Sequence, residues 1–550
     1  MPMATSHSLP SALAVLVTAV TAGAATPESV VSPAPETFFD LDVHGYLRFR
    51  ADLFGKGDLD ARVGGLVTPI DELGANAALD DGNGLQASSN LRLRLEPTFR
   101  VGQLMRIRGT LDILDNLVLG STPDFHSERA DVTLAALAEG QAPADAAISA
   151  KRLWLEWEFF HGIVLSAGRM ADHFGLGIVK NGGDGLDSDY GSSTDRVALL
   201  LQAFGVHSEW FFDSPYEGAT TRDELGGYGQ ASDFGSVDDA IHWGFTVGMR
   251  PIGALAEEAR QKELAEGKPA VDFVIRNAFT THDFESAGVT DATLCSAAAL
   301  QPYDCLRLQT RSVSLWLPDV WVRVLWSPSK ELDVRVELEL AGVVGSASQT
   351  QNLTDPASDK DFLALGGALE VDVRHQDFRY QLNFGAASGD DVAMGPYGES
   401  WRASDDAAYA QSDRLRDNTE ITQFLFHRDY HVDLLLYREV LGGVSNSFYL
   451  RPSVTWTPID VDGLRIGGSL AALYAHAILA ESTPGKDNPL GLEFDLNVFY
   501  EQMSLGGTRA GLRFDVDAGV LIPFGGLDHA AAGLSAGPAF TFQARIGLLY

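Results

Sequence analysis

Three aspartates in a glycine-rich run have the residue type and spacing of a cation site. Residues 181–191 read NGGDGLDSDYG and carry Asp184, Asp187 and Asp189. Ca²⁺ takes about 6–8 oxygen ligands, and a glycine-rich loop can wrap several carboxylates around one ion. The alternative is a solvated acidic loop, which is the commoner state of such a run. A calcium site in this loop is therefore a hypothesis, and the sequence indicates no other cofactor.

Ser535 lies in a match to the nucleophile motif of hydrolases. Residues 533–537 read GLSAG, and that motif needs a strand before the serine and a helix after it. An alternating run follows Ser535 instead, and no histidine or aspartate partner can be named for it. We predict no catalytic residues, and an embedded hydrolase is the weakest of the functions considered.

The two cysteines, Cys295 and Cys305, are separated by SAAALQPYD. A metal site would need further ligands, and the nearest histidine is His282. In an exported chain an even number of cysteines favours a disulfide, so we predict that these two are bridged.

Charged residues stand at every second position of several long alternating runs. Residues 38–54 read FFDLDVHGYLRFRADLF, with apolar residues at the odd positions and mainly charged ones at the even positions. Successive side chains of a strand point to opposite faces, so this run predicts a strand with one apolar and one charged face. It is also long, since strands usually span about 5–6 residues and a membrane-crossing strand needs about 9–11.

The same alternation recurs along the chain. Residues 90–101 and 105–113 form a predicted hairpin, and residues 331–343 repeat the pattern with acids. Further runs are 151–159, 241–250, 271–280, 362–374, 378–386, 448–457, 464–474, 490–500 and 508–520, and the least regular are 196–204, 205–213 and 420–427. Short gaps alternate with long polar ones, which is the asymmetry of an outer-membrane barrel. The prediction is all-β: one transmembrane antiparallel β-barrel of about 18–20 strands, or 16 at the fewest, with short periplasmic turns and long extracellular loops. Residues 254–268 have helical composition and are placed on the periplasmic rim.

Both ends of the chain agree with export. Residues 12–25 are apolar but too short to span a membrane as a helix, so residues 1–24 are predicted as a signal peptide and 25–37 as a proline-rich linker. The barrel is then 38–550. Its last run, FTFQARIGLLY, places Phe542, Leu548 and Tyr550 on one face, and it looks like the terminal assembly signal of bacterial outer-membrane proteins.

The charged faces of the runs are predicted to line the pore. Arginines gather on the first three strands: Arg48, Arg50, Arg92, Arg94, Arg100, Arg106 and Arg108. Acids gather near the eleventh and twelfth: Glu331, Asp333, Glu337, Glu339, Glu370 and Asp372. In a barrel of this size the two groups lie roughly opposite each other and would set a field across a water-filled pore. The alternative is local neutralisation by nearby charges of opposite sign.

Two runs and the opening strand resemble a known family. They are GRMADHFGLGIVKNGGDGLDSDYGSSTDRV (168–197), RDYHVDLLLYREVLGGVSNSFYLRPSV (428–454) and HGYLRFRADLF (44–54). They resemble an uncharacterised family of outer-membrane β-barrel proteins of the myxobacterial type, and the chain is porin-like in general character. The resemblance implies a barrel in the envelope and no particular substrate.

The formal charge of −35 argues against a nucleic-acid partner, because phosphate contacts need clustered basic residues. We expect a bacterial outer-membrane channel for passive diffusion of small hydrophilic solutes. The alternative is a non-conducting barrel that serves as an anchor or displays its loops. The expected partners are outer-membrane lipid and lipopolysaccharide, the barrel assembly machinery and the solutes themselves.

Overall fold

A computed structural model describes residues 39–56, 59, 85–118, 148–214, 240–290, 306–347, 360–390, 420–505, 508, 510–528, 530 and 533–550. The predicted signal peptide (1–24), the linker (25–37) and the predicted disulfide between Cys295 and Cys305 lie outside these ranges.

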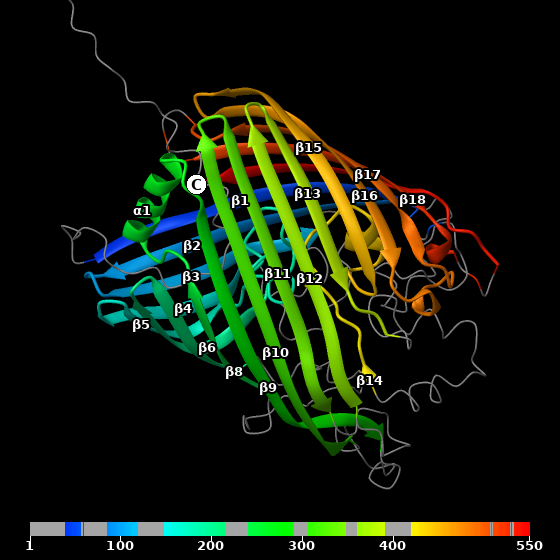
Figure 1. Cartoon of the computed structure of the whole chain (residues 1–550), viewed down its shortest axis with the longest axis horizontal. Coiled ribbons are helices and arrows are strands. Elements are labelled where there is room, and N and C mark those ends of the chain that lie inside the picture. The colour runs from blue at the N-terminus through cyan, green and yellow to red at the C-terminus, as the bar shows by residue number, and fades with distance from the viewer. Residues whose placement is uncertain are drawn as a thin grey trace, which may run out of the picture.

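The described residues form one large antiparallel sheet that closes on itself (Figure 1). Its strands are β1 (Phe39–Gly55), β2 (Leu85–Val101), β3 (Met105–Val118), β4 (Ile148–Phe160), β5 (Ile163–Ala171), β6 (Ser193–Ala203), β7 (Val206–Ser214), β8 (Ile241–Met249), β9 (Ala270–Thr290), β10 (Leu306–Ser329), β11 (Leu332–Ala347), β12 (Lys360–His375), β13 (Phe378–Ala387), β14 (Glu420–Ile421), β15 (Ser447–Val461), β16 (Leu464–Ala477), β17 (Pro489–Gln502), β18 (Gly511–Pro523) and β19 (Ala539–Leu549). β14 is a two-residue segment that pairs in parallel with β12, and β13 pairs directly with β15. The other eighteen strands form the ring, because β19 pairs with β1. The predicted barrel of about 18–20 strands is confirmed, although 420–427 supplies only β14.

The alternation of the sequence becomes the two faces of the barrel wall. On β1, Phe39 and Leu41 are exposed on the outside, whereas Arg48 and Arg50 point inward and are buried. The outer face of the sheet is apolar strand after strand, and a closed sheet leaves no unpaired edge. A closed sheet with an apolar outer surface is the structure by which chains cross the bacterial outer membrane, and that is the location of this protein.

The chain end completes the ring at Tyr550. Its backbone N–H donates to the carbonyl of Gly45 (3.1 Å) and its carbonyl accepts from the Gly45 N–H (3.0 Å). Its hydroxyl donates to the Arg94 carbonyl at 2.8 Å. A Cβ on residue 45 would lie 2.8 Å from that hydroxyl and 2.0 Å from the Arg94 carbonyl oxygen, so only glycine fits here. Phe542 and Leu548 point outward on β19, as predicted for the terminal strand.

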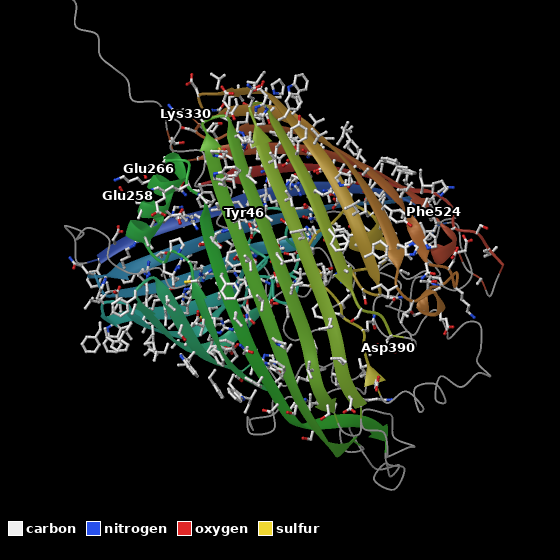
Figure 2. All side chains as sticks on the ribbon, viewed as in Figure 1. Tyr46, Glu258, Glu266, Lys330, Asp390 and Phe524 are labelled. Atoms are coloured by element: carbon white, nitrogen blue, oxygen red, sulfur yellow. The ribbon has the colours of Figure 1, made fainter. Side chains whose placement is uncertain are left out.

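The two rims of the barrel differ in the way that the sequence predicts. Short turns such as 102–104 and 161–162 join strands at one end, which also carries helix α1 (Ala254–Ala265). Figure 2 shows Glu258, Glu266 and Lys330 at this end and Asp390 toward the other. Arg260 of α1 pairs with Asp272 of β9 at 3.0 Å, which fixes the helix to the wall. No helix in the described part of the chain is long and apolar enough to cross a membrane.

Two connections at the other end fold into the barrel. We call residues 172–192, between β5 and β6, the first inserted segment, and residues 422–446, between β14 and β15, the second inserted segment. The second contains a short π-helix, Leu436–Val440. Together with inward residues of the wall it forms the largest apolar cluster of the described residues, with Phe424, Phe426 and Leu435 fully or almost fully buried. The interior of the barrel therefore holds a core of its own at this end.

Candidate functional site

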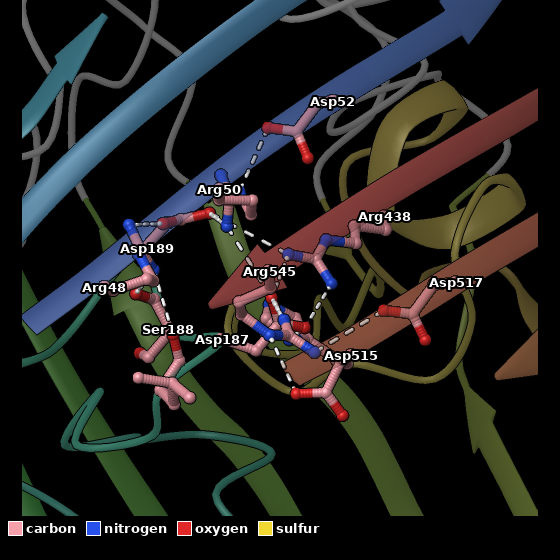
Figure 3. Close-up of polar contacts among 12 residues, drawn as sticks. Arg48, Arg50, Asp52, Asp187, Ser188, Asp189, Arg438, Asp515, Asp517 and Arg545 are labelled. Atoms are coloured by element: carbon pink, nitrogen blue, oxygen red, sulfur yellow. Dashed lines mark hydrogen bonds and ion pairs between the residues drawn. The ribbon is translucent and has the colours of Figure 1, made fainter. Parts of the chain in front are cut away.

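Arginines of β1 and β2 hold the first inserted segment against the wall, and Figure 3 shows Arg48 and Arg50 of β1 beside this segment. Arg48 donates from Nη1 to the carbonyls of Leu186 and Ser188, both at 3.1 Å, and from Nη2 to the Asp189 carboxylate at 3.0 Å. Arg92 donates to the Ser188 carbonyl at 2.7 Å. Both arginines are at most 2% exposed. Their guanidinium groups therefore supply hydrogen-bond donors to carbonyls of the inserted segment, which would otherwise be buried without donors.

The next two wall arginines repeat this arrangement at Asp184. Arg94 donates to the Gly183 carbonyl at 2.9 Å while its other nitrogens bind Asp112 of β3 at 2.8 Å each. Arg152 of β4 binds the Asp184 carboxylate at 2.6 Å. Burial opposes ionisation of Asp184, but Arg152 and Arg94 outweigh it and keep the pKa of this carboxyl below its ordinary value.

The opposite wall holds the beginning of the first inserted segment. Arg276 of β9 donates to both carboxylate oxygens of Asp172, at 2.9 and 3.1 Å. On β11, the carboxylate of Glu339 accepts the backbone N–H groups of Leu176 and Gly177, the latter at 2.9 Å. The segment thus crosses the lumen from β1–β4 to β9–β11.

A wall glutamate also holds the second inserted segment. Glu493 of β17 is fully buried and accepts the backbone N–H groups of Leu434, Leu435 and Leu436 at 2.8–2.9 Å. Three successive amides are thereby satisfied by one carboxylate just before the π-helix, which is the arrangement favoured at a helix start.

Asp433 lies inside the second inserted segment and accepts the N–H groups of Tyr437 and Arg438, the nearest at 2.9 and 3.1 Å. Burial raises the pKa of Asp433 to about 7. This carboxyl therefore changes charge near neutral pH at a point where it supports the backbone of the segment.

The two inserted segments are bonded to each other across the middle of the barrel. The Asp429 carboxylate accepts the N–H groups of Asp189 (3.0 Å) and Tyr190 (3.2 Å). The His427 N–H donates to the Ile178 carbonyl at 2.7 Å. These bonds therefore join two segments that are far apart in sequence.

Asp187 is the meeting point of both segments with the wall (Figure 3). Arg438 of the second inserted segment binds it at 2.6 Å, Arg50 of β1 lies 3.6 Å away, and Arg545 of β19 also pairs with it. Burial opposes its ionisation, but Arg438 and Arg545 keep the pKa of Asp187 well below its usual range. The side chain is 32% exposed, so water reaches it inside the barrel.

The calcium hypothesis does not fit these contacts. Asp184, Asp187 and Asp189 each pair with arginines of the wall or of the second segment. No group of three or more His, Cys, Asp or Glu side chains in the described ranges is arranged to hold a metal ion. The acidic run is also not an outward loop, because it lies in the lumen. Arginine supplies the positive charge that the hypothesis assigned to Ca²⁺.

The predicted pore-lining residues divide between wall and rim. The inward positions of β1–β3 carry the predicted arginines Arg48, Arg50, Arg92, Arg94, Arg100, Arg106 and Arg108. The inward positions of β11 and β12 carry the predicted acids Asp333, Glu337, Glu339, Glu370 and Asp372. The pairing order places these two groups on opposite sides of the ring. Glu331 is the exception, because it lies in the exposed turn before β11.

Both walls are partly neutralised. Arg106 and Arg108 pair with Glu156 of β4, at 3.1 and 3.4 Å. On the acidic side, Arg335 lies 3.0 Å from Glu337 and 3.6 Å from Glu370. Glu156 and Glu370 lie on the strand next to that of their arginines, whereas Arg335 and Glu337 are neighbours on β11.

Ser535 has no nucleophile-elbow geometry. It stands four residues before β19, and the segment that follows it is this strand and not a helix.

Neither a protein-family model nor a curated protein sequence matches the chain. Similar solved structures include Acinetobacter baumannii OccAB2 (8% identity, 92% of this chain and 98% of that one, TM-score 0.46). Pseudomonas aeruginosa OccK9 (OpdG) is similar at 11% identity over 93% and 98% of the chains, with a TM-score of 0.46. The outer membrane protein OprD from Pseudomonas aeruginosa is similar at 10% identity over 95% and 96%, with a TM-score of 0.44. At these identities the likeness says nothing about substrates.

Proposed function

We propose that the protein is a narrow outer-membrane channel through which small hydrophilic solutes diffuse passively. The observation that carries the proposal is the exposure of charged side chains at inward positions. Arg513, Arg379 and Arg108 are 40%, 38% and 27% exposed although they point into the barrel. Charged groups that are this exposed inside a closed sheet require water in the interior.

The two inserted segments narrow this route, so the channel selects solutes by size. Selection by charge would come from the exposed members of the opposed walls, such as Arg108 on one side and Glu370 on the other. Because both walls are partly neutralised, we expect weak ion selectivity at high salt, where the remaining charges are screened within about 8–10 Å. The runs 168–197 and 428–454, which resemble the myxobacterial-type family, contain most of both segments.

The second candidate is a non-conducting barrel that serves as an anchor. The apolar cluster around Phe426 and Leu435 favours it, because it fills part of the interior with dry packing.

Two measurements separate these candidates. Liposomes containing the purified protein should swell in small neutral sugars and fail to swell in large ones, since the inserted segments limit the passage. In a planar bilayer, Arg108→Ser should shift the reversal potential modestly toward cations, because a partly exposed guanidinium is removed. Asp333→Asn on the opposite wall should shift it the other way. Liposomes that exclude even the smallest sugars would show that the barrel does not conduct and would favour the anchor.

A further inference from the structure

Glu339 of β11 is the residue on which the beginning of the first inserted segment depends. It is fully buried, and its Oε2 accepts the amides of Leu176 and Gly177. The fit is close, because a Cβ on Gly175 would lie 2.5 Å from this oxygen, and the φ of +58° also favours glycine. The other oxygen, Oε1, has no hydrogen-bond partner among the described residues.

A second buried carboxyl lies beside it. Asp319 of β10 is 4% exposed, lies beside Glu339 on the same face of the sheet, and has an Oδ1 without a partner in the described part of the chain. We call Asp319 and Glu339 the carboxyl pair. The charged group facing Asp319 from β9 is Arg276, whose guanidinium donates to both carboxylate oxygens of Asp172. From the inserted segment, the backbone amides of residues 176–178 face Glu339.

Two adjacent carboxylates that are removed from water cannot both be ionised at moderate cost, because like charges repel strongly where the dielectric is low. One proton between them removes the repulsion and converts one oxygen into a donor for the other. This is the arrangement in which two buried oxygens without donors satisfy each other.

We propose that the carboxyl pair is a proton-binding site that holds residues 174–178 against the wall, and that loss of this proton releases that part of the first inserted segment. Ionisation of both groups would draw water and counter-ions to Glu339, and the amides of Leu176 and Gly177 would lose a rigid acceptor. Such a site would make the width of the passage depend on pH, and this consequence rests on the proposed function. The binding of the proton itself does not require that the protein conducts.

The second inserted segment shows the same pairing in a compensated form. Glu493 touches Asp495 of the same strand, just as Glu339 touches Asp319. Asp495, however, is bound by Arg451 at 3.0 Å. Arg276 faces Asp319 but gives its hydrogen bonds to Asp172, so Asp319 shares its nearest positive charge with another carboxylate.

Hydrogen exchange tests the proton site directly. Amide exchange of a peptide covering residues 174–178 is measured by mass spectrometry in detergent from pH 5 to pH 9, with each rate divided by that of an unfolded reference peptide. In the wild type the corrected rate should rise with pH, by up to about tenfold per pH unit once the proton is lost. In Asp319→Asn it should stay flat, because the carboxamide donates to Glu339 permanently. Asp333→Asn, an inward residue outside the pair, should behave as the wild type.

Glu339→Gln provides a second carboxamide in case Asp319→Asn fails to fold, and it should also give a flat profile. Equal pH profiles in the wild type and a folded carboxamide variant would overturn the proposal. A wild-type profile that responds to EDTA and not to pH would overturn it in favour of a bound metal ion. If exchange behaves as expected and the protein conducts no ions, the proton site stands and the proposed function fails.

Discussion

The two inserted segments fill the same barrel by different means. The first is polar and glycine-rich, and arginines of the wall bind its carbonyls and its three aspartates. The second buries leucines and aromatic residues in the apolar cluster, and its main polar anchor is the single carboxylate of Glu493.

This difference indicates that the two segments are attached to the wall with unequal strength. An apolar segment is held by many small packing contacts, whose loss is local and gradual. A segment held by buried guanidinium groups depends on a few strong interactions, and each one leaves an unpaired charge when its partner is removed. The first inserted segment is therefore the part that can be displaced as a unit, and the second is the fixed part against which it lies.

Removing Arg48 should have the largest effect. Arg48→Ala leaves the Asp189 carboxylate and two carbonyls with fewer donors in a buried place, at a cost of about 3–5 kcal/mol to the seating of the first segment. We expect faster proteolysis within 183–191 and a larger single-channel conductance. The closed sheet itself should be unaffected, so the variant and the wild type should show the same strand content by circular dichroism. Arg100→Ala is the control, because Arg100 pairs with Asp40 near the opposite rim, where both side chains are a third or more exposed. Such a pair contributes about 0–1 kcal/mol. Equal effects of Arg48→Ala and Arg100→Ala on proteolysis and conductance would contradict the claim that buried arginines hold the first segment.

Truncation in the second segment should have a smaller and more local effect. Leu436→Ala removes a fully buried side chain and should cost about 2–5 kcal/mol, depending on how far the site collapses. Hydrogen exchange should increase around 434–441 with little change in 183–191. Leu425→Ala is the control in the same segment, since Leu425 is 41% exposed. If Leu436→Ala released residues 183–191 as strongly as Arg48→Ala does, the two segments would have to be treated as one unit.

Residues 183–191 of the first segment and residues 434–438 of the second should respond to pH in opposite directions. The pKa of Asp187 is held well below its usual range, so its ion pairs stabilise residues 183–191 at all pH values above about 4 and are lost only in stronger acid. The pKa of Asp433 is raised to about 7 by burial, so between about pH 4 and pH 7 the folded state binds more protons than the unfolded state. Stability of the second segment therefore falls as pH rises through this window. Asp433→Asn should flatten the pH profile of exchange at 434–438 and leave that of 183–191 unchanged. A profile for 434–438 that stays steep in Asp433→Asn would assign the effect to another group.

The barrel itself was predictable from the sequence because each strand carries its own evidence. The alternation in 38–54 fixes which side of β1 faces lipid, and a slip by one residue would turn Arg48 and Arg50 outward. The rims followed from gap lengths, and the position of 254–268 followed from its helical composition. β9 extends beyond the predicted run 271–280, and β10 matches none of the predicted runs, because strand pairing continues where alternation in the sequence fades.

The inserted segments were not predictable from local pattern. The run 181–191 has the composition of a solvated loop, and nothing within it shows that wall arginines lie opposite its carbonyls. Glu493 looked like any inward acid of the run 490–500, because its three amide partners belong to residues 434–436. Arg438 and Arg545 were missed for the same reason, since their common partner, Asp187, is far from both in sequence. The one signal that the sequence offered was that two of the runs in which we predicted a family resemblance, 168–197 and 428–454, overlap these segments.

Single-channel conductance in a planar bilayer tests the central claim, that this is a water-filled barrel narrowed by two segments of unequal attachment. The wild-type protein should give discrete openings of small conductance, and Arg48→Ala should give larger and noisier ones, while Arg100→Ala matches the wild type. A wild-type protein that inserts as a folded barrel but gives no openings at any voltage, and stays silent in Arg48→Ala, would contradict the account.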